Sequence, residues 1–265
     1  MKFRTLVSVA LVVLTVDSLA AQAGSWKQVN SDTDYSDTIA GVAIGNKLFT
    51  IENAGGLYVT DVTTGDWKPL GQPEFGDTVK AFAVGGRLVT LESDGSLYLV
   101  STTDGTWRGI GRPGDWANTI AGVGIQNMLY TVEDTGALYA TDISTGRWRQ
   151  VGEIEFGDTV EMFAVGDNLV TLESDGSLYL VSTADGSWSQ IGSAGEWADT
   201  IAGVGTSSAL YTVEDGGALY VTDISTGSWK RLGQSDFGDT VAMFAAGDGL
   251  YILEKEGALY SVAVR

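Results

Sequence analysis

The sequence predicts an all-β fold, a six-bladed β-propeller built from four-stranded antiparallel blades. Two observations support this prediction. A tryptophan recurs every 40 or 41 residues, and a fixed period of this length is typical of propellers and other repeat architectures. Each repeat also contains four short runs rich in β-branched and aromatic residues, without helical periodicity. Six such repeats therefore predict six blades. The recurring tryptophans are Trp26, Trp67, Trp107, Trp148, Trp188 and Trp229.

The first repeat shows how one blade is specified. Gly45-Asn46 is a two-residue hairpin signal between the first two runs, and Glu52 opens a Glu-x-x-Gly turn before the third. A third turn follows at 61–65, where Asp and Gly shape the loop. The predicted strands of this repeat are 38–44, 47–52, 56–61 and 66–70.

The two ends of the chain predict how the ring closes. The last repeat ends at Arg265 without a tryptophan, whereas Trp26 lies near the start of the chain with no earlier strands of its own. We therefore expect residues 24–29 to supply the outer strand of the last blade. Such closure leaves no open sheet edge.

A second repeat of 81 residues overlies the first. The segment TLESDGSLYLVS occurs at 90–101 and again, unchanged, at 171–182. Odd repeats share TIAGV at their first strand, and even repeats share FGDTV. The ring is therefore predicted to have pseudo-threefold symmetry, with three blade pairs, and a ligand site built on this pattern should recur.

The N-terminus predicts export and a two-part domain organisation. Lys2 and Arg4 precede an apolar run at 6–16, and small residues follow at Ala21 and Ala23. This layout is typical of a secretory signal peptide. We expect residues 1–23 to be the signal peptide, residues 24–265 to be the propeller, and the protein to be secreted or periplasmic.

The composition excludes several function classes. The formal net charge of −19 disfavours nucleic acid and anionic lipid as partners, because phosphate binding requires clustered Lys and Arg. The chain has no Cys, so no disulfide framework supports the fold. It also has no His, which removes the usual general base and the commonest ligand of transition metals.

The repeats resemble a known group of proteins. Segments such as GSLYLVSTADGSWSQIG (176–192) and GALYVTDISTGSWKRLG (217–233) resemble the blades of secreted bacterial β-propellers. They are similar, more loosely, to those of tectonin- and tachylectin-type lectin propellers. The likeness rests on scaffold residues, and it implies repeated sugar sites between the blades or on top of them.

Two columns of polar residues recur in all six repeats. We expect Glu52 to lie opposite Ile39 and diagonal to Asp37, which would gather both columns around one mouth of the central channel. One hypothesis is a Ca²⁺ site, since hard cations prefer oxygen ligands. The alternative is that each carboxylate accepts hydrogen bonds from backbone N–H or indole groups and locks the blades together. The first column is Glu52, Glu92, Glu133, Glu173, Glu214 and Glu254, and the second is Asp37, Asp77, Asn118, Asp158, Asp199 and Asp239.

Aromatic residues precede the second column, and they differ between odd and even repeats. Even repeats carry Phe, whereas odd repeats carry Tyr or Trp beside Asp or Asn. We expect the odd-repeat aromatics to be exposed and to stack on a sugar, with packing between blades as the alternative. The recurring tryptophans, by contrast, are expected in the core. The predicted ligand-binding residues are Tyr35, Trp116, Trp197, Asp37, Asn118 and Asp199.

These observations predict a secreted, non-catalytic binding protein, lectin-like, with repeated carbohydrate sites on one face of the propeller. Repetition favours this function because weak sites gain avidity when several engage at once. One alternative is a docking platform for a protein of the cell envelope or matrix. A metal-assisted hydrolase or lyase is a further alternative, through the acidic columns.

Overall fold

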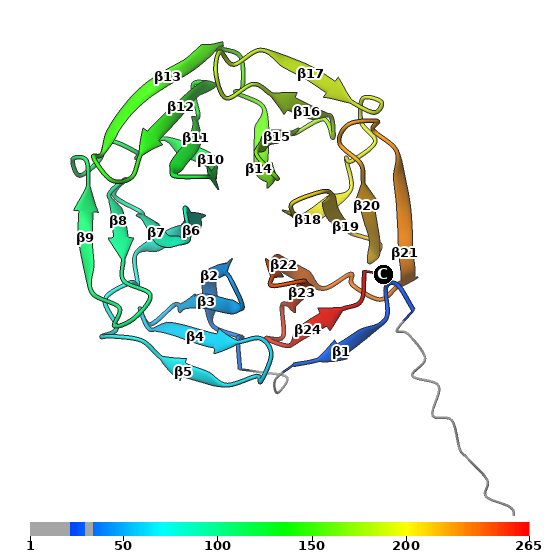
Figure 1. The fold of residues 1–265 in the computed structure, drawn as a ribbon, viewed down its shortest axis with the longest axis horizontal. Coiled ribbons are helices and arrows are strands. Elements are labelled where there is room, and N and C mark those ends of the chain that lie inside the picture. The colour runs from blue at the N-terminus through cyan, green and yellow to red at the C-terminus, as the bar shows by residue number, and fades with distance from the viewer. Residues whose placement is uncertain (1–21, 30–33, 265) are drawn as a thin grey trace, which may run out of the picture.

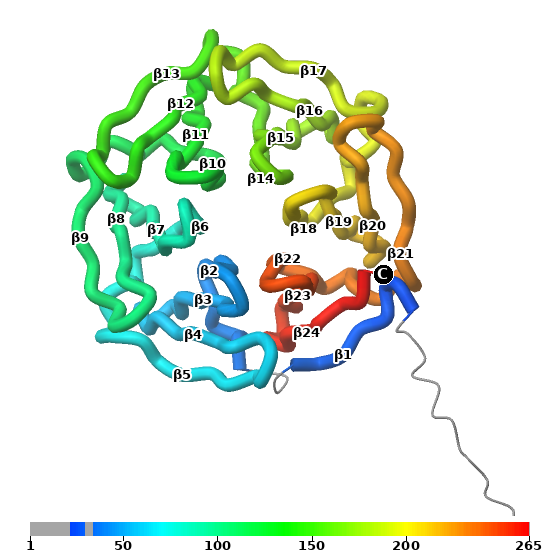
Figure 2. Tube along the Cα trace, in the orientation of Figure 1, coloured from blue at the N-terminus to red at the C-terminus, as the bar shows by residue number. Residues whose placement is uncertain are grey.

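The computed structural model describes residues 22–29 and 34–264 and forms a ring of six four-stranded sheets around a common axis (Figure 1). Every sheet is antiparallel, and in five of the six its strands follow one another outward from the axis in chain order. The predicted six-bladed all-β fold is confirmed. The tube view shows the first strand of each blade nearest the axis (Figure 2).

The odd blades each use four consecutive strands. Blade 1 consists of β2 (Thr38–Ile44), β3 (Lys47–Glu52), β4 (Leu57–Asp61) and β5 (Trp67–Pro69). Blade 3 consists of β10 (Thr119–Ile125), β11 (Met128–Glu133), β12 (Ala137–Asp142) and β13 (Arg147–Ile154). Blade 5 consists of β18 (Thr200–Gly205), β19 (Leu210–Glu214), β20 (Ala218–Thr222) and β21 (Trp229–Ser235).

The even blades repeat this plan, except that the last takes its outer strand from the N-terminus. Blade 2 consists of β6 (Thr78–Val84), β7 (Arg87–Glu92), β8 (Leu97–Val100) and β9 (Trp107–Ile110). Blade 4 consists of β14 (Thr159–Val165), β15 (Asn168–Glu173), β16 (Leu178–Val181) and β17 (Trp188–Ile191). Blade 6 consists of β22 (Thr240–Ala246), β23 (Gly249–Glu254), β24 (Leu259–Val262) and β1 (Trp26–Gln28).

Ring closure follows the sequence prediction. β1 pairs antiparallel with β24, with Trp26 opposite Val262 and Gln28 opposite Tyr260. Without β1, the edge of β24 would present unpaired backbone groups to water. Of the predicted signal peptide, only Gln22 and Ala23 lie within the described residues. The part of the chain that the structure describes contains no helix able to cross a membrane.

A β-bulge near the start of each inner strand corrects the predicted register. Thr38 lies opposite Glu52 and Ala40 opposite Ile51, so that Ile39 is the extra residue. The expected pairing of Glu52 with Ile39 is therefore wrong by one residue, because a bulge places two residues of one strand against one of its partner. The same shift recurs at the start of the inner strand in each of the other five blades.

The hydrophobic core is divided into six clusters, and each includes one residue of the same aromatic column. Each ring comes from the loop that enters the inner strand. Burying it removes a large apolar surface from water. The column is Tyr35, Phe75, Trp116, Phe156, Trp197 and Phe237, each 1 to 4% exposed.

Candidate functional site

The aromatic residues predicted to stack on a sugar are buried. Tyr35 is 2% exposed, and Trp116 and Trp197 are each 4% exposed. The Tyr35 hydroxyl shares a 2.7 Å hydrogen bond with Thr60 Oγ1, inside the protein. The expectation that these rings form exposed platforms is therefore wrong. Each ring belongs to a core cluster, where it fills space between buried apolar side chains.

Their predicted polar partners do lie on the surface. Asp37, Asn118 and Asp199 are exposed. Their backbone carbonyls each accept a 2.9 Å hydrogen bond from the amide that follows the glutamate of the same blade. These bonds fix the position of each residue beside the end of the second strand. The structure therefore separates the three polar side chains from the buried rings with which they were grouped.

The exposed aromatic residues are the recurring tryptophans, which were predicted to be core. Each is 38 to 53% exposed. They lie on the outermost strands, where no further strand covers them (Figure 1). Each contacts a tyrosine of the neighbouring third strand. The ring centroids of Tyr179 and Trp188 are 4.9 Å apart at 76°, an edge-to-face contact, whereas those of Tyr58 and Trp67 stack at 4.2 Å and 5°.

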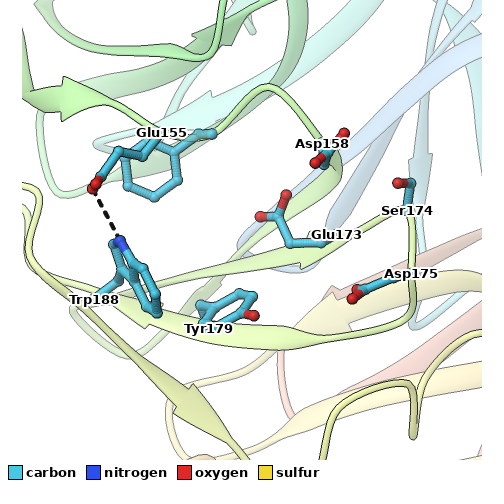
Figure 3. A pocket seen from close by; sticks show the side chains of 8 residues that line it. Glu155, Asp158, Glu173, Ser174, Asp175, Tyr179 and Trp188 are labelled. Carbon is cyan, nitrogen blue, oxygen red and sulfur yellow. Dashed lines mark hydrogen bonds between the residues drawn. The ribbon is translucent and has the colours of Figure 1, made fainter.

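In blade 4 the exposed tryptophan forms one wall of a cavity of about 210 Å³. Figure 3 shows Tyr179 beside Trp188, with the acidic side chains gathered around the same space. The Trp188 indole N–H donates a 3.0 Å hydrogen bond to Glu155 Oε2. The cavity is lined by Glu155, Phe156, Asp158, Glu173, Ser174, Asp175, Tyr179 and Trp188.

Glu173 lies at the centre of this acidic surface. The Thr159 hydroxyl donates a 2.9 Å hydrogen bond to its Oε1. Burial raises the pKa of Glu173, and the hydrogen bonds from Thr159 and Thr171 offset part of this rise, while the charges of Asp158 and Asp175 add to it. The carboxylate is thus held in a site that disfavours its negative charge.

The glutamate column does not converge on one site. In blade 2, Thr78 donates to Glu92 at 2.9 and 3.1 Å, as Thr159 does to Glu173 in blade 4. Glu92 and Glu173 are therefore each bound within their own blade. No group of three or more acidic residues within 22–29 and 34–264 could hold a metal ion. The cation site predicted from Glu52, Glu92, Glu133, Glu173, Glu214 and Glu254 stays a prediction, without a cluster of metal ligands among the described residues to support it.

The even blades share the hydrogen bond from tryptophan to carboxylate. Trp107 Nε1 donates to Glu74 Oε2 at 2.8 Å in blade 2, and Trp26 Nε1 donates to Asp236 Oδ2 at 3.3 Å in blade 6. The corresponding carboxylates of two odd blades act differently. Asp115 accepts from the Arg112 amide at 3.1 Å, and Glu196 accepts from the Ser193 amide at 2.8 Å.

The sequence contained a signal for these indole–carboxylate bonds. An acidic residue directly precedes every residue of the buried aromatic column. In blades 2 and 4 this acidic residue lies 33 residues before the tryptophan that it contacts. In blade 6 it contacts Trp26, which the N-terminus supplies to that blade. Sequence reasoning missed the pockets because it placed the tryptophans in the core. The acidic residues are Asp34, Glu74, Asp115, Glu155, Glu196 and Asp236.

Comparisons with known proteins support the fold and go no further. No protein-family model and no curated protein matches the sequence. A Bacteroides thetaiotaomicron protein of unknown function is similar in structure, with 15% identity over 92% of this chain and 73% of its own, and a TM-score of 0.65.

Two further solved structures share the architecture. Virginiamycin B lyase from Staphylococcus aureus is 10% identical over 91% of this chain and all of its own, with a TM-score of 0.61. The computationally designed protein Ika8 is 17% identical over 86% of this chain and 71% of its own, with a TM-score of 0.56. At these identities the likeness concerns the fold alone, and a β-propeller scaffold supports many binding functions.

Proposed function

We propose that this protein is an exported, non-catalytic carbohydrate-binding protein whose sugar sites are the tryptophan pockets of blades 2 and 4. The observation that carries the proposal is the exposed Trp188 ring, held by Glu155 beside a cavity lined with carboxylates. The resemblance of the repeats to lectin propellers points in the same direction. It concerns the scaffold, whereas the pocket supplies the chemistry.

The pocket offers both kinds of contact that a sugar ring requires. The exposed indole of Trp188 gives an apolar surface for the C–H face of a pyranose. Carboxylate and hydroxyl oxygens of Asp158, Glu173 and Ser174 can accept hydrogen bonds from sugar hydroxyls. The cavity of about 210 Å³ offers room for a small polar ligand such as a single sugar ring.

Two equivalent sets of tryptophan and carboxylate side chains suit a ligand that is itself repetitive. Blade 2 has the same arrangement as blade 4, with Trp107, Tyr98, Glu74, Asp77 and Glu92 in the corresponding positions. A polysaccharide or a glycan-bearing surface can engage both pockets of one chain. The second contact then forms within the complex, and weak single sites produce useful avidity.

Binding without catalysis fits the same chemistry. A glycosidase separates an acid from a nucleophile or base by placing two carboxylates in unlike environments. Here the same set of carboxylates recurs in two blades, whereas a catalytic site would be expected to differ from the equivalent position in the other repeat. Prolonged incubation of the protein with the oligosaccharide it binds should therefore leave the oligosaccharide intact.

A docking role has its own supporting observation. The bulged residues near the axis present β-branched side chains to solvent. Several exposed apolar residues around one opening can together form a surface for a partner protein. A partner protein could cover this surface, which lies at the same end of the inner strands as the carboxylates. The exposed residues are Ile39, Val79, Val160, Ile201 and Val241.

A glycan array tests the carbohydrate function, with paired tryptophan variants as matched controls. Trp107→Ala with Trp188→Ala should abolish binding by removing the stacking surface of both proposed pockets. Trp148→Ala with Trp229→Ala removes two equally exposed rings from odd blades and should leave binding unchanged. Absence of glycan binding by the unmodified protein would contradict the proposal and favour the docking role.

A further inference from the structure

Resting on the proposed function, we propose that the pockets of blades 2 and 4 select a protonated amino sugar over its neutral N-acetylated form. The ligand class is a glycan with unsubstituted 2-amino groups. Three features of the pockets lead to this conclusion: their charge, the aromatic wall, and the side chain that occupies the equivalent position in blade 6.

The charge of the blade 4 pocket is entirely negative. Four carboxylates line it, and its lining includes no Lys or Arg. Three of the four have partners in the protein. Glu155 accepts from Trp188, Glu173 accepts from Thr159, and Asp175 accepts from the Ser177 amide at 2.8 Å. Such a pocket repels uronic and sialic acids and attracts cations.

Asp158 is the carboxylate left for a ligand. It is exposed, it lines the cavity, and its side chain makes no hydrogen bond within the described part of the chain. Its backbone carbonyl accepts from the Ser174 amide at 2.8 Å, which fixes its place beside Ser174. In blade 2, Asp77 is held in the same way by the Ser93 amide at 2.8 Å.

Blade 6 shows where a cation binds in this arrangement. Lys255 occupies the position of Ser93 and Ser174, directly after the glutamate of the second strand. Its ammonium donates a 3.0 Å hydrogen bond to Asp239, the residue equivalent to Asp158. The chain thus places an ammonium group on this carboxylate in one even blade. In the other two, a serine leaves the carboxylate accessible.

The aromatic wall makes the predicted ligand a sugar amine and not a simple ion. Trp188 is 50% exposed, and a ring beside carboxylates attracts a cation through its face while also covering apolar C–H groups. A glucosamine unit carries both features on one ring. N-acetylation removes the charge and therefore the contact with Asp158, but it leaves the stacking surface.

Isothermal titration with two matched oligosaccharides tests the selectivity. The probes are tetramers of glucosamine and of N-acetylglucosamine, compared at pH 6 and at a fixed salt concentration. We expect the glucosamine tetramer to bind about tenfold more tightly, as a charge-assisted contact of about 1.4 kcal/mol implies. Asp77→Asn with Asp158→Asn should abolish this preference.

A second pair of substitutions controls for net charge. Asp167→Asn with Asp248→Asn changes the net charge equally, and both residues lie exposed in the turns that follow inner strands, at the opposite ends from Asp158 and Asp239. This control should keep the tenfold preference. If it loses the preference, or if glucosamine binding survives Trp107→Ala with Trp188→Ala, the selectivity is a general attraction of polycations and the inference is wrong.

The outcomes separate this inference from the function on which it rests. Equal affinities for the two tetramers, both abolished by the tryptophan pair, would overturn the amine selectivity and keep the carbohydrate function. Binding of neither tetramer, together with silence on a glycan array, would overturn both.

Blade 6 offers a gain-of-function test. Lys255→Ser removes the ammonium that contacts Asp239, in a blade where Trp26 makes the same indole–carboxylate bond as Trp107 and Trp188. The stoichiometry of single glucosamine units should then rise from two to three per chain. A folded Lys255→Ser protein that still binds two would contradict the role assigned to this lysine.

Discussion

The Trp188 indole N–H lies 3.0 Å from Glu155 Oε2, and this hydrogen bond joins the outer strand of blade 4 to the loop that enters the same blade. The bond orients a half-exposed ring that also contacts Tyr179. An exposed aromatic ring with a fixed orientation loses little entropy when a ligand binds to it.

Glu155→Gln with Glu74→Gln should weaken these ring contacts in both pockets. We expect sugar affinity to fall severalfold and the free energy of unfolding to fall by about 1 kcal/mol, because a neutral acceptor replaces a charged one. Titration followed by tryptophan fluorescence measures the affinity. Glu153→Gln, at an exposed position on the neighbouring strand β13, should change neither quantity.

Trp197→Ala should destabilise the protein far more than Trp148→Ala. The buried Trp197 side chain fills a core cluster, and its removal should cost about 3–5 kcal/mol. The Trp148 ring is 53% exposed, so its loss should cost about 1 kcal/mol. Urea denaturation compares the two. Equal losses would contradict the assignment of the odd-blade loop aromatics to the core.

Stability should fall as pH rises from about 4.5 to 8. Burial raises the pKa of Glu161 from 4.5 to about 7, and the nearby Lys80 offsets part of this rise. Both states are protonated below the unfolded pKa, so this contribution is fully present there and is lost as pH rises through the folded pKa, at a cost of up to about 3 kcal/mol.

The variant Glu161→Gln isolates this effect. Glu161 and Lys80 line the same cavity near the axis, of about 230 Å³, together with small inner-strand residues such as Ala40, Gly41 and Ala81. Urea denaturation at pH 5 and pH 8 should show a smaller difference for the variant than for the unmodified protein. An unchanged difference would assign the pH dependence to other groups, such as Glu92 and Glu173, whose pKa values burial also raises.

Gly205→Ala should destabilise the ring at the axis. A Cβ at Gly205 would overlap the backbone carbonyl oxygen of Ala164 on the adjacent inner strand, which cannot move without displacing the blade. We expect a loss of more than about 2 kcal/mol. Gly109→Ala is the control, since a Cβ there meets no atom within 4 Å. Thermal unfolding followed by circular dichroism separates the two variants.

The number of blades, the strands within them and the closure by residues near Trp26 could all be predicted from the amino-acid sequence. Period, turn residues and strand composition are local properties, and the structure confirms what they predict. The predicted hairpin at Gly45-Asn46 joins β2 to β3 as expected. Even the pseudo-threefold pattern has a structural counterpart, since the indole–carboxylate bonds occur in the even blades.

Which aromatic residues are buried could not be predicted in this way and became clear from the folded arrangement. Trp116 and Trp148 are the same residue type in recurring motifs, yet one is 4% exposed and the other 53%. Exposure depends on what covers a side chain from elsewhere in the chain, which a repeat pattern does not encode. The bulge at Ile39 likewise changed the partner of Glu52. One extra residue in a strand shifts its pairing register, and the pattern of apolar and polar residues in the sequence does not mark that shift. The candidate site therefore lies on the outer strands, where the edge of each sheet leaves a tryptophan in contact with water.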